Sequence, residues 1–211
     1  IQKTENFLLG NEVVNNLFWE TLSGLVKVPS SSAWAGVIIE NGEIKLCAVR
    51  TEANYLLISS GKNIYLEHLI QYFKRKKWKL KGVSGPRQGS LCFSKIWLKG
   101  VPEQVEGRRD FGIYESPKKI SQWRNESTKQ YSIKAVGTNE WPRARLWALN
   151  FACESNPPLN GSALVLMAKK MMKKQSLFFI QSANFETCGM AGFGRETPSY
   201  FIINLVYVPV K

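Results

Sequence analysis

The chain is poor in the residue types that build metal centres and disulfide frameworks. Its single histidine, His68, excludes a metal site made of several imidazoles. Its four cysteines are widely spaced, and no two of them form the close pair of a zinc site; they are Cys47, Cys92, Cys153 and Cys188. We therefore expect no metal centre, and we expect four free, buried thiols of the kind found in cytoplasmic proteins.

Long apolar runs are also missing. No run reaches the roughly 18 residues that a membrane span needs, and the longest ones, 163–168 and 200–208, have the length of strands or core segments. The first residues, Ile1-Gln2-Lys3, are not followed by the apolar core of a signal peptide. These absences predict a protein that does not enter membranes and that resides in the cytoplasm.

Acidic residues are scarce compared with basic ones. The chain has 29 Lys and Arg against 16 Asp and Glu, a net charge of +13, which favours anionic partners such as nucleic acid, anionic lipid or phosphorylated small molecules. Much of the excess lies in two runs, Lys74–Lys81 and Lys169–Lys174. Each run includes the C-terminal end of an expected helix, where cations complement the helix dipole, so solvated helix ends are the alternative explanation to a polyanion site for both runs.

Residues 1–127 combine helical and strand patterns and form the first expected domain. Apolar residues at three- and four-residue steps predict one helix at Asn6–Leu25. Asn41-Gly42 is a hairpin signal between two strand patterns. The expected strands are 33–40, 44–51, 55–59 and 109–115, with a helix at 64–76 and a mixed, partly helical segment at 89–98.

Residues 128–211 form the second expected domain, after a polar boundary segment at 116–128. Pro142 suits the first turn of a helix, and Pro157-Pro158 ends it. The expected elements are a strand (131–136), two helices (139–155 and 162–174) and three strands (177–181, 187–193 and 200–208). The fold class is therefore α+β, with mainly antiparallel sheets flanked by helices in two related halves.

Four short motifs point to function. Trp147–Glu154 is similar to a W-x-x-x-F-x-x-E helix, and Asn204–Pro209 is similar to an N-x-V-Y-T-P strand end. Gly189–Pro198 matches the preceding strand and turn, and Phe7–Phe18 matches an L…NN-L opening. Together with the order of the elements, these motifs resemble the GNAT family of N-acetyltransferases, in particular its two-domain bacterial branch with the acyl-CoA N-acyltransferase-like fold.

The resemblance implies transfer of an acetyl group from acetyl-CoA to an amine acceptor, which the motifs do not identify. The backbone of Leu205, Val206, Tyr207 and Val208 would pair with the pantetheine arm as an added strand. A backbone N–H of Val206 or Tyr207 would polarise the thioester carbonyl. Glu154 is the candidate base and Tyr207 the candidate acid, while surface or packing roles stay open for both.

The sequence departs from the family at the pyrophosphate-binding loop, a Q/R-x-x-G-x-G/A pattern that should follow the last strand. Only Val210 and Lys211 follow Pro209, and Gly85–Gly89 follows no clear strand. We therefore expect weak or absent coenzyme binding, either because the sequence is part of a longer acetyltransferase or because the scaffold has lost transfer. A basic module that binds nucleic acid or another polyanion through Lys74–Lys81 is the alternative, and a structural or homodimeric protein is a third.

Overall fold

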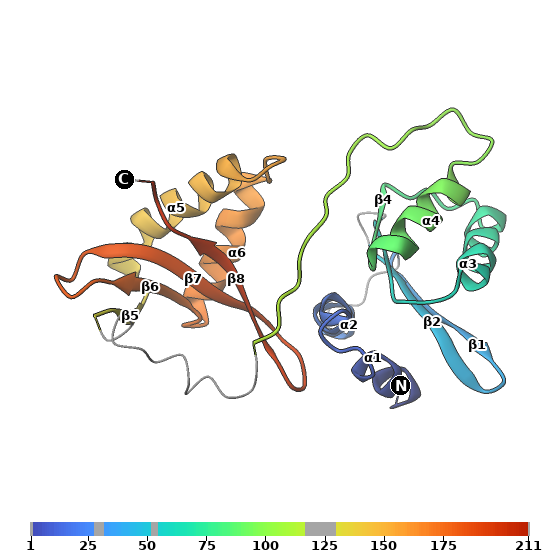
Figure 1. The fold of residues 1–211 in the computed structure, drawn as a ribbon, viewed down its shortest axis with the longest axis horizontal. Coiled ribbons are helices and arrows are strands. Elements are labelled where there is room, and N and C mark those ends of the chain that lie inside the picture. Colours follow the sequence, from blue (N-terminus) through green and yellow to red (C-terminus); the bar gives the residue numbers. More distant parts are fainter. Residues whose placement is uncertain (1, 28–31, 52–54, 117–129, 211) are drawn as a thin grey trace. The chain divides into compact units, whose positions relative to one another are not determined.

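The computed structural model describes residues 2–27, 32–51, 55–116 and 130–210 (Figure 1). The chain divides into two compact units, Ile1–Ile113 and Tyr114–Lys211, each with its own four-stranded sheet. The fold is therefore mixed α+β, with two largely antiparallel sheets flanked by helices. The domain boundary expected after residue 127 lies outside the described residues. In the described part of the chain, no helix combines the length and the apolarity that a membrane crossing requires.

Unit 1 has the sheet order β1-β2-β3-β4. The first three strands are antiparallel, and β4 runs parallel to β3 after a crossover through α3. The elements are α1 (Gln2–Leu9), α2 (Asn16–Lys27), β1 (Trp34–Glu40), β2 (Glu43–Arg50), β3 (Tyr55–Ile58), α3 (Asn63–Arg75), β4 (Gly82–Ser84) and α4 (Arg87–Trp97).

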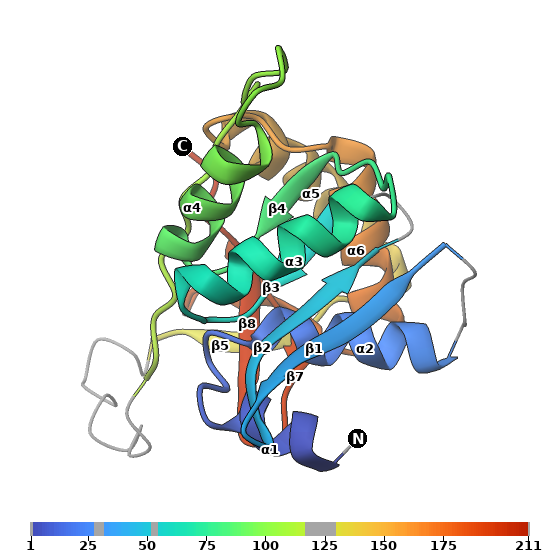
Figure 2. The same ribbon diagram turned by 90° about the vertical axis from the view of Figure 1, so that its right-hand side faces the viewer.

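Strand β2 lies at the centre of unit 1 and is buried on both faces. Leu46 and Ala48 pack with α3 and α4, whereas Cys47 and Val49 pack with α1 and α2. Because side chains alternate along a strand, this pattern places helices on both sides of the sheet, as Figure 2 shows. Unit 1 therefore has three layers, and α3 and α4 form one of them.

The prediction of a single helix at 6–25 is wrong, because α1 ends at Leu9 and a separate helix, α2, begins at Asn16. The Asn15 side chain donates to the Leu8 carbonyl at 3.1 Å, and that of Asn16 donates to the Val13 carbonyl at 2.7 Å. Asparagine side chains compete in this way with helical hydrogen bonds, which explains why the apolar periodicity continues across a break.

The hairpin prediction at Asn41-Gly42 is confirmed, since both residues have positive φ, at 53° and 78°. Two other expectations are wrong: the strand at 109–115, and the absence of a clear strand before Gly85–Gly89, which follows β4 directly. The segment 109–115 forms no strand, and all its side chains are exposed. A strand that the sequence pattern missed, β4, has only three residues and owes its place to parallel pairing with β3.

Unit 2 follows the predicted order of elements and has the sheet order β5-β6-β7-β8, antiparallel throughout. Strand β7 is longer than expected, which moves the turn before β8 to Thr197–Tyr200. The elements are β5 (Ser132–Ala135), the 3₁₀ turn η3 (Thr138–Glu140), α5 (Trp141–Glu154), α6 (Gly161–Lys173), β6 (Leu177–Gln181), β7 (Thr187–Glu196) and β8 (Phe201–Tyr207).

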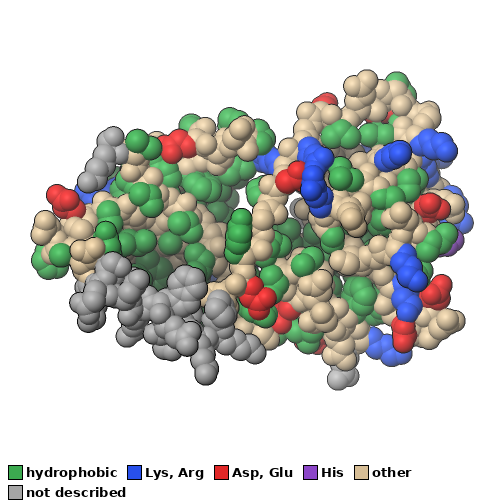
Figure 3. All heavy atoms as spheres, viewed as in Figure 1, with side chains coloured by type: hydrophobic (Ala, Val, Ile, Leu, Met, Phe, Trp, Pro, Cys, Tyr) green, Lys and Arg blue, Asp and Glu red, His purple; other side chains and the backbone are tan. Residues whose placement is uncertain are grey.

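The two faces of the unit 2 sheet differ. Helices α5 and α6 cover one face around a core that includes Phe179 and Met190, both fully buried (Figure 1). The other face carries apolar side chains that remain exposed, among them Ile133, Phe201 and Ile203. Figure 3 shows hydrophobic side chains gathered over this unit. The described part of unit 2 therefore has two layers.

All four cysteines are free, as expected, but not all are buried. Cys47 is buried, and burial raises the pKa of its thiol to about 12. Cys92 and Cys188 are half-buried, and Cys153 is exposed on α5 directly after the buried Ala152. The expectation of four buried thiols therefore holds fully for Cys47 alone. It is wrong for Cys153, because the periodicity of α5 places that position on its outer face.

Two glycines provide a matched test of the fold of unit 1. Gly85 has a φ of 157°, and a Cβ there would lie 2.4 Å from the Ile58 carbonyl oxygen; Gly24, within α2, has no atom within 4 Å of such a Cβ. We predict that Gly85→Ala lowers the free energy of unfolding by about 2 kcal/mol or more. Gly24→Ala should raise it by about 0.5–1 kcal/mol. Equal effects in urea unfolding would contradict the conformation described at Gly85.

Candidate functional site

Strand β8 is an edge strand with a bulge. It pairs with β7 and with no other strand in the described part of the chain. Tyr207 lies opposite Met190 but Asn204 lies opposite Gly192, so β8 has one extra residue at this point. Within the bulge, Leu205 has a φ of 52°, a left-handed conformation that is uncommon for a residue other than glycine. The ladder is therefore interrupted where the sequence predicts contact with the coenzyme.

The four predicted coenzyme-binding residues divide between core and surface. Leu205 and Tyr207 are buried, at 3% and 5% exposure. Val206 and Val208 are 54% and 66% exposed. The buried pair holds the end of β8 on the core, while the open edge of the strand offers backbone groups to a further strand-like partner.

The structure brings together the two predicted catalytic residues, Glu154 and Tyr207. The Tyr207 hydroxyl donates to Glu154 Oε1 at 2.8 Å, although the residues are 53 positions apart. Glu154 is the last residue of α5 and is exposed, whereas the Tyr207 ring is buried. The hydrogen bond therefore lies at the boundary between core and solvent, at the end of both elements.

Aromatic packing positions this pair. Trp147 and Phe151 of α5 lie one turn apart, and their ring centroids are 5.9 and 6.5 Å from that of Tyr207, with edge-to-face geometry. Trp147 also contacts Phe179 of β6 at 5.3 Å. Since these contacts dock α5 across the sheet, Glu154 reaches the end of β8.

The surroundings of Tyr207 favour the protonated form of its hydroxyl. The hydrogen bond to Glu154 is the largest cause of a raised Tyr207 pKa, and burial acts in the same direction. A hydrogen bond with Asn150 acts in the opposite direction. Asn150 was not predicted as part of the site, although its position one turn before Glu154 was the available signal. A protonated phenol on an anionic partner can serve as a proton donor.

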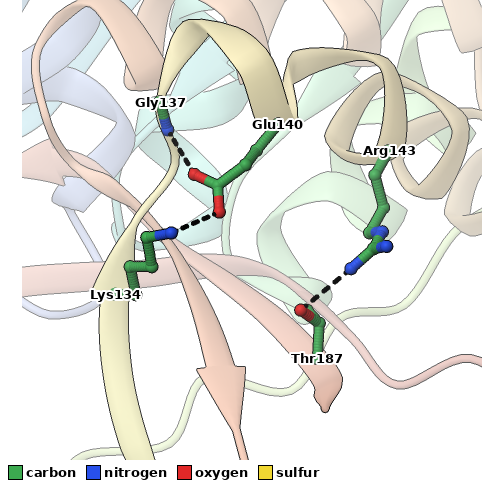
Figure 4. A network of polar contacts seen from close by, with 5 residues as sticks. All are labelled: Lys134, Gly137, Glu140, Arg143 and Thr187. Atoms are coloured by element: carbon green, nitrogen blue, oxygen red, sulfur yellow. Dashed lines mark hydrogen bonds and ion pairs between the residues drawn. The ribbon is translucent and has the colours of Figure 1, made fainter. Parts of the chain in front are cut away.

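A second polar network joins the start of α5 to the sheet (Figure 4). Glu140 accepts from Lys134 Nζ at 2.8 Å and from the Gly137 backbone N–H at 2.9 Å. Arg143 donates to the Thr187 hydroxyl at 3.0 Å. The sequence analysis does not predict this network, although the three-residue spacing of Gly137 and Glu140 is that of a helix-capping contact. The network fixes the N-terminal end of the helix whose other end carries Glu154.

The basic run Lys74–Lys81 lies at the C-terminal end of α3, and the run Lys169–Lys174 at that of α6, as expected for solvated helix ends. The six cations of the first run are all exposed. Trp78 is the candidate for base stacking within this run. The centroid of its ring is 5.1 Å from the Arg50 guanidinium carbon and 5.3 Å from the centroid of the Phe73 ring. The run therefore presents charge to solvent but no free aromatic face at Trp78.

No group of three or more His, Cys, Asp or Glu side chains within the described ranges could hold a metal ion. Comparisons of the chain with protein-family profiles, curated proteins and solved structures find no match. The geometry around β8 and α5 is therefore the basis for a functional assignment.

The Glu140 network predicts a pH-dependent contribution to stability. Lys134 first, and then the Gly137 N–H, lower the pKa of Glu140. Because the folded pKa is depressed, the contribution is present above the unfolded pKa and is lost as the pH falls through the folded value. We predict that Glu140→Gln lowers the free energy of unfolding by up to about 1 kcal/mol near neutral pH and by nothing measurable near pH 2–3. The exposed Glu186→Gln is the matched control, and an equal loss at both pH values would contradict the assignment.

Proposed function

We propose that unit 2 is an N-acetyltransferase of the GNAT type, which moves an acetyl group from acetyl-CoA to an amine. The observation that carries this proposal is the hydrogen bond between Tyr207 and Glu154 beside a bulged, open-edged strand. A phenol at the end of an edge strand, with a carboxylate as its partner, supplies an acid and a base at the place where an extended thioester ligand could pair.

The edge of β8 would hold the pantetheine arm. Its two amides can pair with strand backbone in the way that an added strand does, since pantetheine is extended and carries amide N–H and C=O groups. The bulge at Leu205 interrupts the ladder and frees backbone groups there. In this arrangement a backbone N–H of Val206 or Tyr207 donates to the thioester carbonyl oxygen and stabilises the negative charge that develops on it.

The Tyr207–Glu154 pair would accept one proton from the amine and donate one to the leaving thiolate. The amine nitrogen attacks the thioester carbonyl carbon, the new C–N bond forms, and the nitrogen loses a proton to Glu154, directly or through water. The C–S bond then breaks, and the leaving thiolate takes the proton of the Tyr207 hydroxyl. Glu154 returns its proton to the Tyr207 oxygen along the 2.8 Å hydrogen bond, which restores both groups.

The test is acetyl-CoA turnover by the chain with a panel of primary amines, measured by thiol release. We predict that Tyr207→Phe, which keeps the packed ring, lowers kcat by about 10²–10³-fold, and that Glu154→Gln lowers it by a similar factor. Tyr131→Phe, at a tyrosine that is 49% exposed in the same unit, is the matched control and should change kcat less than about twofold.

Two outcomes would contradict the proposal. One is a folded wild-type chain that consumes neither acetyl-CoA nor S-acetylpantetheine, a thioester that needs no pyrophosphate loop, with any amine tested. The other is turnover that Tyr207→Phe leaves intact, which would assign the Tyr207–Glu154 hydrogen bond to packing alone.

A second candidate function is electrostatic binding of a polyanion such as single-stranded nucleic acid, favoured by the six exposed cations of Lys74–Lys81. Because the Trp78 ring packs against Arg50 and Phe73, we expect binding without base preference. The logarithm of affinity should fall with that of salt concentration with a slope of about −3 to −4. In a gel shift, Lys77→Gln with Lys79→Gln should reduce the slope by about 1.4.

The paired variant Lys169→Gln with Lys170→Gln, in the run at the end of α6, is the control for this second candidate. It removes the same charge from a different helix end. An equal loss of affinity in both double variants would assign binding to net charge and would contradict a site at Lys74–Lys81.

A further inference from the structure

The face of the β1–β2 hairpin that packs on α3 contains a hollow of about 290 Å³, and none of its lining residues belongs to the proposed transfer site. Its lining is mostly apolar, and Trp34, His68 and Tyr72 supply the polar side-chain atoms among the lining residues. Ligand sites in proteins have this character, a mostly apolar concavity with few polar groups at the rim.

The register of the hairpin explains why the hollow exists. Gly36 lies opposite Ala48, between the larger pairs Trp34–Arg50 and Ile38–Leu46. Opposite residues in an antiparallel pair share one face of the sheet, so the two smallest side chains form a low floor between taller neighbours. A Cβ at Gly36 would lie 2.3 Å from the Trp34 ring, which shows that the indole leans over the glycine. The hollow therefore depends on small residues at two specific positions.

Aromatic rings form one wall of the hollow. The Trp34 and Tyr72 centroids are 5.6 Å apart, and their planes differ by 30°. On α3, His68, Tyr72 and the C-capping Lys76 follow at four-residue steps and so lie along one face of the helix. Lys76 Nζ is 5.9 Å from the Tyr72 ring centroid, which places a cation beside the aromatic wall.

Two charged residues of the hairpin, Arg50 and Glu40, are held by contacts within the protein. Arg50 donates to the Ser32 carbonyl oxygen at 2.6 Å and covers Trp78. Glu40, at the far end of β1, accepts from the Tyr65 hydroxyl at 2.8 Å. Lys76 is exposed and lies on the same helix face as the aromatic wall, so it is the cation best placed for an anion at the rim.

We propose that this hollow binds a flat aromatic anion. The ring of the ligand lies against the Trp34 and Tyr72 rings, beside the part of the Gly36–Ala48 floor that the Trp34 indole covers, and its carboxylate or phosphate pairs with Lys76. Aromatic pairs favour this arrangement beyond their buried area, and a cation at the rim selects an anionic ligand over a neutral one. The site belongs to unit 1, so it is independent of the acetyl transfer proposed for unit 2.

Aromatic carboxylates and nucleoside monophosphates share this chemistry, and calorimetry on the full chain can distinguish them. The probes are 2-naphthoate, the neutral 2-naphthamide and adenosine monophosphate. We expect a Kd below about 1 mM for 2-naphthoate and a three- to tenfold weaker Kd for the amide. The ligand would be a nucleoside phosphate if adenosine monophosphate binds at least as tightly as 2-naphthoate and responds to the variants in the same way. Binding of 2-naphthoate alone would support an aromatic carboxylate.

Variants distinguish the contribution of the apolar floor to ligand binding from that of the Lys76 charge. Ala48→Val fills the floor and should weaken 2-naphthoate binding about tenfold or more. If Ala48→Val does not fold, Tyr72→Leu removes the aromatic wall instead and should weaken binding in the same direction. Lys76→Gln should abolish the preference for the acid over the amide. Lys62→Gln, at the exposed lysine that caps the N-terminal end of α3, should leave that preference unchanged.

Three results would overturn the proposal. The first is no binding of either anion to the folded chain up to about 10 mM, a range in which even weak sites of this size bind. The second is 2-naphthoate binding that neither Ala48→Val nor Tyr72→Leu changes. The third is binding of a thymidine oligonucleotide without binding of 2-naphthoate, which would assign the basic end of α3 to nucleic acid.

Discussion

The contact of Trp147 with Phe179 and Tyr207 is the interaction on which the candidate site depends. It joins α5 to both β6 and β8, because the Trp147 ring centroid is 5.3 Å from that of Phe179 and 5.9 Å from that of Tyr207. Because α5 is held at this point and again at its start by the Glu140 network, its last residue, Glu154, meets the Tyr207 hydroxyl. The hydrogen bond of the proposed acid–base pair is thus a consequence of core packing, because Tyr207 contributes both its ring to the packing and its hydroxyl to the bond.

The bulge in β8 adds a second constraint. An edge strand with unpaired backbone is open to unwanted pairing, and bulges are one means by which proteins make an edge irregular. In β8 the bulge also turns the buried Leu205 and Tyr207 inward while Val206 remains exposed. One local distortion therefore protects the sheet edge and gives it a distinctive backbone at the proposed thioester site.

Much of this arrangement follows from the sequence, for identifiable reasons. The pattern of unit 2 predicts its strands and helices because they are long and periodic, and the W-x-x-x-F-x-x-E spacing places Trp147, Phe151 and Glu154 along α5. The break before α2 escapes prediction because it rests on side-chain hydrogen bonds of Asn15 and Asn16. The hollow in unit 1 cannot be predicted from the sequence either, because it depends on the strand register that sets Gly36 opposite Ala48.

The central claim is that the edge of β8 binds the thioester arm of acetyl-CoA. Titration of the isotope-labelled chain with S-acetylpantetheine, followed by backbone amide resonances, tests it most directly, because this ligand lacks the nucleotide. We predict that the largest shifts occur at the amides of Val206, Tyr207 and Val208. Absence of shifts at these positions at about 10 mM ligand, a concentration that detects even weak binding, would contradict the account, and so would shifts confined to unit 1.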